Sequence, residues 1–301
     1  MLNVIDTTID GKQKKQYRGV SKATRFIQSL ALWIPLVIIA LMIILAIFAP
    51  WISPHDPTQG KITDRYTPPA FMAGGKSAYL LGTDQLGRDI MSRIIYGARI
   101  SLSVSLLAIV ITASIGTVLG IAAGYGGGRI DAVIMRIVDV ALSFPGLLLA
   151  MLLAVAIGPG FWTVVFALSL LGWAGYARMI RGEALRIAQS DFVAQSHIVG
   201  ASSFRIMFRH IFPNIINSLI VLMTLQVGMM ILAEAALSYL GLGVSVPTPS
   251  WGSMVSDGRA NLDNAWWISA FPGICIGLVV LSGNFLGDWL RDKLDPRLRQ
   301  I

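Results

Sequence analysis

The chain of 301 residues is hydrophobic at 55% of its positions and charged at 13%. An average soluble domain is charged at about 25% of its positions, so this chain has too few charges to cover a soluble fold of its length. The net charge of +8 does not indicate a nucleic-acid partner, because the Lys and Arg residues gather between long apolar segments. The composition excludes an ordinary soluble protein and predicts a membrane protein surrounded by lipid.

Several apolar segments are long enough to cross a bilayer, which takes about 20 residues. The uncharged run 140–177 exceeds one span, and Gly158-Pro159-Gly160 divides it into two. The first segment is too long for a signal-peptide core, so we expect it to be retained. We predict an all-α protein with six transmembrane helices, at 31–50, 100–124, 136–157, 161–177, 214–241 and 268–287.

The Lys and Arg residues also predict the orientation of the chain, because cytoplasmic loops carry more of them. With the N-terminus inside, the inner segments hold 17 of the 24 Lys and Arg residues. We therefore expect a multi-pass protein of a bacterial inner membrane, with both termini in the cytoplasm.

Five parts follow from these spans and this orientation. We expect a basic cytoplasmic tail, a first transmembrane helix, a periplasmic loop, a core of five transmembrane helices and a second cytoplasmic tail. Their ranges are 1–30, 31–50, 51–99, 100–290 and 291–301, and the core contains the inner loop 190–212.

The inner loop reads as two short helices joined at a glycine. Ser190 or Asp191 can begin the first helix as a cap. Gly200 suits the left-handed residue that ends such a helix. A second short helix then runs towards Pro213, just before the fifth span.

Apolar side chains give this loop a hydrophobic surface, from Phe192, Val193, Ile198 and Val199. An exposed apolar surface of this kind suits a docking site for another protein. It suits equally a helix that lies on the lipid headgroups. The residues alone leave both interpretations open.

Two acidic residues fall inside predicted spans. An ionisable group in hydrocarbon is costly, so each should face protein or water. Glu234 lies near the outer end of the fifth span, where it either pairs at the interface or lines a pathway. Asp139 lies near the inner end of the third span, where we expect it to pair with Arg136, one turn away.

Small and polar residues recur along two spans. In the second span, Gly116, Gly120 and Gly124 form consecutive Gly-x-x-x-Gly steps, which predict close packing against another helix. A stripe on the fifth span indicates either close packing or the wall of a water-filled pathway, and it consists of Asn217, Thr224, Gly228, Ala235 and Ser238.

The run 84–99 alternates charged and apolar residues before the second span. This pattern suits a segment along the outer membrane surface, with its charges paired or extended to water. We favour a structural anchor. Gating or contact with a binding protein is the alternative.

No catalytic or metal-binding group is recognisable. The segment 70–77 fits a relaxed phosphate-loop pattern, but it lacks the preceding strand that such a loop needs and is expected outside the cell. His55, His197 and His210 are scattered, without metal-ligand spacing or a nucleophile partner. We expect no cofactor and no metal in this chain.

The inner loop resembles the coupling loop of ABC importer permeases. Ala194-Gln195-Ser196 stands where the family pattern has Glu-Ala-Ala, and Gly200 and Pro213 fall on the pattern's Gly and Pro. In that family the loop docks on the ATPase subunit. The resemblance therefore implies a set of ATPase-coupling residues, namely Phe192, Val193, Ala194, Gln195, Ser196, His197, Ile198, Gly200, Ala201, Phe204 and Pro213.

Three further stretches resemble the C-type permease subunit of dipeptide, oligopeptide and nickel importers. They lie at 81–102, 233–252 and 287–299, in the family's order. The first carries a periplasmic motif made of Gly82, Thr83, Asp84, Gly87, Arg88, Asp89, Arg93 and Arg99.

This resemblance implies a type I ABC importer permease fold that translocates peptides or a similar small solute. It also implies a second permease, two ATPase subunits that bind ATP and Mg²⁺, and a periplasmic or lipid-anchored binding protein. The transport pathway would then be lined in part by Asn217, Thr224, Gly228 and Glu234.

An ion-coupled secondary transporter is the alternative function. Such a protein needs an ion or proton relay in its core, for which only Asp139 and Glu234 are candidates. A membrane-embedded enzyme would need grouped His, Cys or carboxylate side chains, and none are grouped here.

Overall fold

The computed structural model describes the backbone of residues 22–294, and the side chains of 33–170 and 172–294. Most of the two expected tails, 1–30 and 291–301, lies outside these residues. Within the described part the fold is all-α, as predicted, and extended pairing is limited to two isolated bridges. The helices are α2 (Lys22–Ile47), α3 (Ala49–Ile52), η1 (Ile62–Asp64), α4 (Ile90–Gly126), α5 (Gly128–Ser143), α6 (Gly146–Ile157), α7 (Phe161–Ala188), α8 (Asp191–Ile198), α9 (Ser203–Ile206), η2 (Met207–Ile211), α10 (Phe212–Tyr239), α11 (Trp251–Gly258), η3 (Arg259–Asn261), α12 (Leu262–Ala265) and α13 (Trp267–Leu294).

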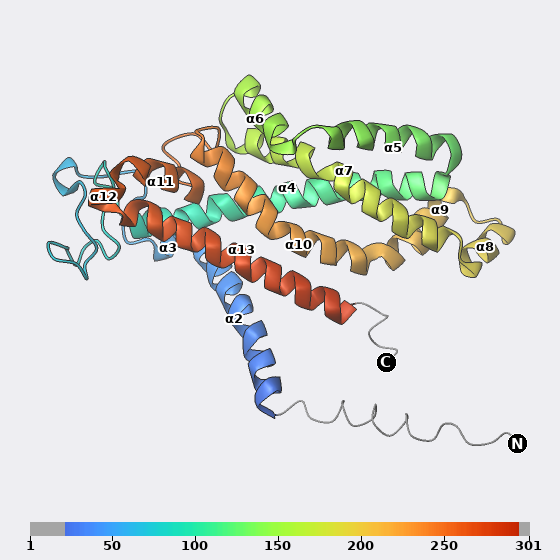
Figure 1. The fold of residues 1–301 in the computed structure, drawn as a ribbon, viewed down its shortest axis with the longest axis horizontal. Coiled ribbons are helices and arrows are strands. Elements are labelled where there is room, and N and C mark those ends of the chain that lie inside the picture. The colour runs from blue at the N-terminus through green and yellow to red at the C-terminus, as the bar shows by residue number, and fades with distance from the viewer. Residues whose placement is uncertain (1–21, 295–301) are drawn as a thin grey trace, which may run out of the picture.

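The long helices form an elongated bundle (Figure 1). Helix α4 packs against α7 and α10, and α10 packs in turn against α13. Helix α2 contacts α4 and α13, and α5 lies along α4 and α7. The short helices α11 and α12 lie at one end of the bundle, and α8 and α9 lie at the opposite end (Figure 1).

Glycines bring α4 and α7 into close contact. A methyl group added at Gly120 would lie 2.8 Å from the carbonyl oxygen of Ala177, and one at Gly124 would lie 2.7 Å from Cβ of Ala184. A methyl group at Gly116 would likewise overlap Tyr176. The predicted close packing of the Gly-x-x-x-Gly steps is confirmed.

The apolar helices agree in part with the predicted spans. Four helical segments are long and apolar enough to cross a membrane, namely α4, the continuous run Ser203–Tyr239, α7 and α13. The bent pair α5–α6 adds a fifth candidate span if the two helices together are counted as one span. Helix α2 is apolar over Trp33–Ile47, the stretch whose side chains the structure describes, so the number six stays a prediction.

The third predicted span, 136–157, is wrong as a single helix. Helix α5 already begins at Gly128, and the chain bends by 83° between α5 and α6. The cause is Pro145, which lacks an N–H group and pushes the preceding residue away from helical geometry. Phe144 accordingly has extended angles, with φ −94° and ψ 141°.

Helix α4, which contains the second predicted span, begins at Ile90, ten residues before that span. Asp89 caps the helix, because its side chain accepts a hydrogen bond from the backbone N–H of Ser92 at 2.9 Å. At 1.5 Å per residue, α4 is about 55 Å long, well beyond the roughly 30 Å of a hydrocarbon core. The end of the run 84–99 therefore forms the first turns of a helix.

Candidate functional site

The inner loop begins with α8, which is fixed to the bundle by one buried side chain. Val193 is fully buried and packs with residues of α7 and of the run Ser203–Tyr239, including Ile187, Ile206 and Ile211. Ser190 occupies the cap position, but its hydroxyl donates to the carbonyl of Ile187 at 2.5 Å and caps nothing. Packing therefore holds α8 in place.

Gly200 ends α8 in the left-handed conformation, with φ +82°. Its N–H donates to the carbonyl of His197, and the N–H of Ala201 donates to the carbonyl of Ser196, each at 3.0 Å. These two bonds form a Schellman motif, which closes the helix and turns the chain. A side chain at Gly200 would meet nothing within 4 Å, so backbone conformation alone requires the glycine.

A second short helix, α9, follows and merges through the π-helical segment η2 into α10. Ser202 caps α9 by accepting from the N–H of Arg205 at 3.4 Å. Pro213 lies in the first turn of α10, directly after the π-helical segment η2. The predicted sequence of helix, glycine and helix is therefore present.

Exposed apolar side chains cover the tip of this loop. Ile198 is 85% exposed and Val199 is 87% exposed, beside the glycine turn. Phe192 is exposed on α8, and the rings of Phe204 and Phe208 lie 4.4 Å apart on the next turn, also exposed. Val193, which was expected on this surface, lies beneath it instead, because it faces the bundle. We call the five exposed residues the apolar tip.

The remaining coupling candidates lie around this tip. Ala194, Gln195 and His197 are exposed on α8, and Ser196 is half-buried, with its hydroxyl bonded to the carbonyl of Phe192 at 2.7 Å. Ala201 is half-buried beyond the turn. Helix α8, which carries four of them, lies at one end of the bundle (Figure 1).

His197 also joins the loop to the end of α4. Its ring is stacked on that of Tyr125, with centroids 5.9 Å apart and an angle of 3° between the planes. The Tyr125 hydroxyl and Nε2 of His197 lie 3.2 Å apart. The loop is thus connected to α7 and α10 by Val193 and to α4 by His197.

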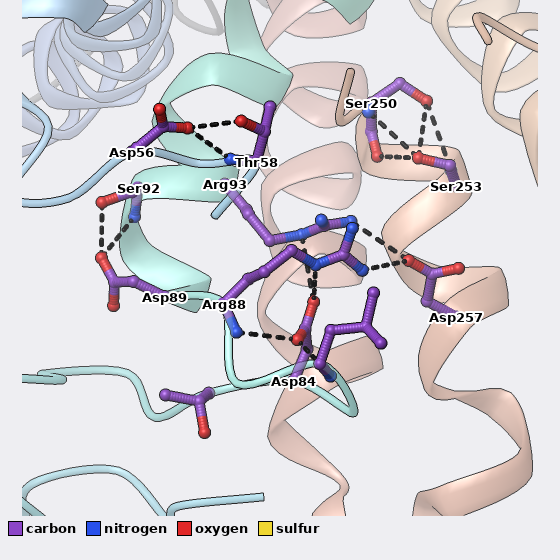
Figure 2. Close-up of polar contacts among 12 residues, drawn as sticks. Asp56, Thr58, Asp84, Arg88, Asp89, Ser92, Arg93, Ser250, Ser253 and Asp257 are labelled. Carbon is purple, nitrogen blue, oxygen red and sulfur yellow. Dashed lines mark hydrogen bonds and ion pairs between the residues drawn. The ribbon is translucent and has the colours of Figure 1, made fainter. Parts of the chain in front are cut away.

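At the opposite end of the molecule, Asp84 organises the turn before α4 (Figure 2). Its Oδ1 accepts from the N–H groups of Leu86 at 2.8 Å and Arg88 at 3.0 Å. Its Oδ2 accepts from Nε of Arg88 at 2.6 Å. Arg93, one turn into α4, lies with its Nε 3.6 Å from the same oxygen.

Asp257 on α11 completes this group. Its Oδ2 lies 3.5 Å from Arg88 and 3.1 Å from Arg93, so both guanidinium groups lie between two carboxylates (Figure 2). Burial raises the pKa of the Asp257 carboxyl, and the charges of Arg93 and Arg88 oppose that rise. We call Asp84, Arg88, Arg93 and Asp257 the charge cluster.

These charges pair with one another, which is one of the two predicted arrangements, and they do so inside the protein and not on an exposed surface. Asp84, Arg88, Asp89 and Arg93 are all buried, and among the charges of the run 84–99 Arg99 alone is exposed. Hydrogen bonds to backbone and side chains satisfy much of the charge, which makes burial tolerable. The cluster therefore ties α4 to α11 as an internal anchor.

The other motif residues shape the chain around this cluster. Gly82 and Gly87 both have positive φ, 82° and 74°, and a side chain at Gly87 would overlap the backbone of Lys61. The carbonyl of Thr83 accepts from Nε1 of Trp267 at 3.1 Å, which fixes the loop to the start of α13. These residues support an anchoring role for the motif.

The four pathway candidates on α10 differ in exposure. Asn217 is exposed, and Thr224 is half-buried with its hydroxyl bonded to the carbonyl of Ile220 at 2.8 Å. A methyl group at Gly228 would lie 2.8 Å from Asn284 of α13, so this glycine permits close packing. Glu234 is fully buried and accepts from the hydroxyl of Ser238 at 2.7 Å. Their role in a pathway stays a prediction.

Asp139 has a different partner from the one predicted. Its Oδ1 lies 2.5 Å from Nη2 of Arg178 on α7, and no ion pair to Arg136 occurs in the described structure. The spacing of Asp139 and Arg136 favours a pair within one helix, but α7 places a guanidinium directly beside the carboxylate.

Sequence reasoning missed three partners because each lies far along the chain. Tyr125 is 72 residues from His197, Arg178 is 39 residues from Asp139, and Asp257 is 164 residues from Arg93. A local spacing rule has no access to such pairs. Only the packing of the bundle brings them together.

Comparison with known proteins identifies the family of this chain. Residues 116–300 match the binding-protein-dependent transport system inner membrane component, which covers more than half of the chain. The chain belongs to this family. Residues 23–69 match the N-terminal TM domain of oligopeptide transport permease C. The resemblance recognised in the sequence is therefore confirmed, and the chain is a multi-pass permease of this family.

The permease is similar along most of its length to known peptide transport permeases. It is 42% identical to the di/tripeptide transport system permease protein of Pseudomonas aeruginosa, over 88% of this chain and 87% of that protein. It is 42% identical to the dipeptide transport system permease protein of Bacillus subtilis, over 88% and 81%. It is 44% identical to the dipeptide transport system permease protein of Escherichia coli, over 88% of each chain.

Proposed function

We propose that this permease is one of two membrane-spanning subunits of an ATP-driven importer for dipeptides and similar short peptides. Its relatives of 42% to 44% identity are named as dipeptide or di/tripeptide permeases. Similarity over nearly the whole chain supports the same substrate class here. The role is passage and not catalysis, and we expect no catalytic site and no resident cofactor in this chain.

The proposed assembly contains four further components. A second permease completes the transmembrane pathway, and two ATPase subunits that bind ATP and Mg²⁺ dock on the cytoplasmic side. A periplasmic or lipid-anchored binding protein delivers the peptide from outside. The family description, a binding-protein-dependent inner membrane component, supports such a division of labour.

The apolar tip carries the proposal for ATPase docking. Ile198 and Val199 are almost fully exposed, although an apolar side chain gains about 1.5–3 kcal/mol when it is buried. They stand on a helix whose position is fixed by Val193 and His197. An exposed apolar surface that is held in a fixed position, as the apolar tip is, suits docking into a groove on a partner protein.

The length of α4 favours a protein partner over lipid headgroups. Arg99 is exposed near the outer end of α4, and the stretch 99–126 is about 40 Å long at 1.5 Å per residue. The hydrocarbon core takes about 30 Å of this length. Because α8 contacts Tyr125 at the far end of α4, the apolar tip then stands about 10 Å inside the cytoplasm.

Motion of the ATPases would reach the spans through the contacts of this loop. Coupling requires two states that are biased by both sites. Val193 connects α8 to α7 and α10, and His197 connects it to α4. These are the elements that form the centre of the bundle, so a shift of α8 would change their packing.

Co-purification tests the proposal. A tagged permease is extracted from native membranes in mild detergent, and its partners are identified by mass spectrometry. We expect a second permease and an ATPase to accompany it, together with ATP hydrolysis that a dipeptide-loaded binding protein stimulates. A permease that purifies alone and transports without ATP would support the ion-coupled alternative.

A further inference from the structure

Helix α5 has two exposed faces of different character. At 100° per residue, Arg136, Asp139 and Ser143 fall within an arc of about 60°. All three are exposed. A neighbouring arc of about 80° is also exposed but entirely apolar, and it consists of Ile130, Val133, Ile137 and Val140. The buried side, around Val138, faces α7.

The polar arc carries an ion pair that the rest of the described chain leaves exposed. The side chains of Asp139 and Arg178 are 58% and 52% exposed, although their charged ends meet at 2.5 Å. Exposed charges in a membrane-spanning segment face protein or water and not lipid, because their transfer into hydrocarbon is costly. The polar arc is therefore turned away from the acyl chains.

The polar arc leads to the break between α5 and α6. Val138 packs with Ala174 and Ala177 of α7. Pro145 lies about 10 Å further along the helix axis, at 1.5 Å per residue. In the antiparallel helix α7 this corresponds to the level of residues 168–170, near the middle of its apolar stretch 161–177. The break therefore lies near the middle of the membrane.

The backbone at this break is only partly paired, because the carbonyl of Pro145 accepts from the N–H groups of Leu148 at 3.0 Å and Leu149 at 3.3 Å. Pro145 has no N–H group to donate, and its side chain makes no cap for α6. The hydroxyl of Ser143 is bonded to the carbonyl of Asp139 at 2.7 Å, inside α5. Phe144 is 54% exposed, so the break lies open at the surface of the chain. Irregular backbone at membrane depth is tolerated only within protein or against a water-filled cavity.

We propose that the arc of Arg136, Asp139 and Ser143, together with the break at Phe144 and Pro145, lines the aqueous path of the transported solute. This inference rests on the proposed function and assigns the path to a segment outside α10. Contact with the second permease is the competing explanation. The centres of such interfaces are depleted of charge, which makes the polar arc a poor match and the apolar arc a good one.

Cysteine accessibility tests this assignment in the complete importer. The single cysteine of the chain, Cys275, is replaced by alanine, and Ser143→Cys is introduced in that background. Ile137→Cys is the matched control, because it lies on the apolar arc of the same helix and is also exposed. Both importers are placed in lipid nanodiscs and treated with a charged, membrane-impermeant thiol reagent.

We expect Ser143→Cys to react about tenfold faster than Ile137→Cys, because the reactive thiolate forms only in contact with water. Depth alone predicts the opposite order, since Ile137 lies about 9 Å nearer the cytoplasmic end of α5. Equal rates, or faster reaction of Ile137→Cys, would overturn the assignment. If Ser143→Cys does not assemble, Gly146→Cys on the other side of the break gives the same comparison.

ATP-driven uptake by the Cys275→Ala importer is measured in the same preparation, so that the two proposals fail separately. Uptake that depends on ATP, with an unreactive cysteine at position 143, overturns the assignment of the path and leaves the importer intact. Uptake without ATP overturns the proposed function, whatever the labelling rates.

Discussion

The imidazole ring of His197 lies parallel to the phenol ring of Tyr125, with 5.9 Å between the ring centroids. This pair joins the middle of the inner loop to the C-terminal end of α4. The loop would otherwise reach the bundle mainly through Val193 and the residues after Gly200. We therefore expect the pair to pass movement of α8 to α4.

Replacing Tyr125 with alanine should uncouple ATP hydrolysis from transport. An aromatic pair contributes about 0.5–1.5 kcal/mol beyond its buried area, so transport per ATP should fall roughly two- to tenfold. Tyr125→Phe keeps the stacked ring, loses the hydroxyl contact and should have a smaller effect. Hydrolysis and uptake are measured side by side in proteoliposomes. An unchanged ratio in Tyr125→Ala would remove the pair from the coupling route.

Gly200 should tolerate asparagine better than valine. Its φ of +82° costs an ordinary side chain about 1–2 kcal/mol, and asparagine is the residue that adopts this region most readily after glycine. Space is not the obstacle, because a side chain there would meet nothing within 4 Å. We expect Gly200→Val to insert but to lose transport, and Gly200→Asn to retain most of it. Equal transport by the two variants would show that the Schellman turn is not needed for coupling.

The apolar tip should lose the ATPase when it gains a charge. Ile198→Asp removes about 1.5–3 kcal/mol of apolar burial from the proposed interface, so affinity should fall at least tenfold. Ser203→Asp adds the same charge in the same loop at the start of α9, where an acidic residue is favourable. ATPase recovery on the tagged permease is compared by quantitative blotting. Loss with both variants, or with neither, would argue against docking through Ile198.

Removal of Asp257 should destabilise the end of the bundle that contains α11. Asp257→Ala leaves Arg88 and Arg93 buried with one carboxylate between them, and an uncompensated buried charge costs about 3–5 kcal/mol. Asp263→Ala, on the neighbouring helix α12 and exposed, is the matched control. We expect a lower thermal midpoint for the first variant alone. Equal midpoints would show that the cluster adds little to stability.

The loop before α4 should loosen in acid. The ammonium group of Lys76 lowers the pKa of the Asp64 carboxyl, and the hydroxyl of Tyr79 donates to the same carboxylate at 3.1 Å. A lowered pKa stabilises the folded loop fully above the ordinary aspartate pKa of about 4, and this contribution is lost as the pH falls through the lower folded value.

Hydrogen exchange over residues 61–80, corrected for the intrinsic pH dependence of exchange, measures this loosening. We expect protection in the wild type to drop between about pH 4 and pH 2, below the ordinary aspartate range. Asp64→Asn cannot ionise, so its protection should be lower at neutral pH and flatter across the range. A wild-type profile that matches that of Asp64→Asn would contradict the role of the pair.

The local features of this fold were predictable from the sequence. Gly116, Gly120 and Gly124 indicated the close helix contact that they make. Gly200 indicated the end of α8, because a left-handed backbone conformation at a helix end favours glycine. The start of α4 was missed by ten residues. Asp89 is a suitable cap for a helix that begins at Ile90. The charged residues after it suggested a segment before the helix and not the helix itself.

The contacts between distant segments were not predictable. Asp139 was predicted to pair with Arg136 on its own helix, whereas its partner in the structure is Arg178 of α7. Val193 was placed on the exposed face of α8, because the sequence does not say which side of so short a helix meets the bundle. The break at Pro145 was missed because the apolar residues on both sides satisfy the composition of a single span.

The most direct test of this account is uptake of a labelled dipeptide into proteoliposomes. The vesicles contain this permease, its second permease and the ATPases, with binding protein outside and nucleotide inside. We expect uptake only with ATP, binding protein and all membrane subunits together, and none with a non-hydrolysable analogue. Uptake by this chain alone, driven by an ion gradient without ATP, would contradict the account.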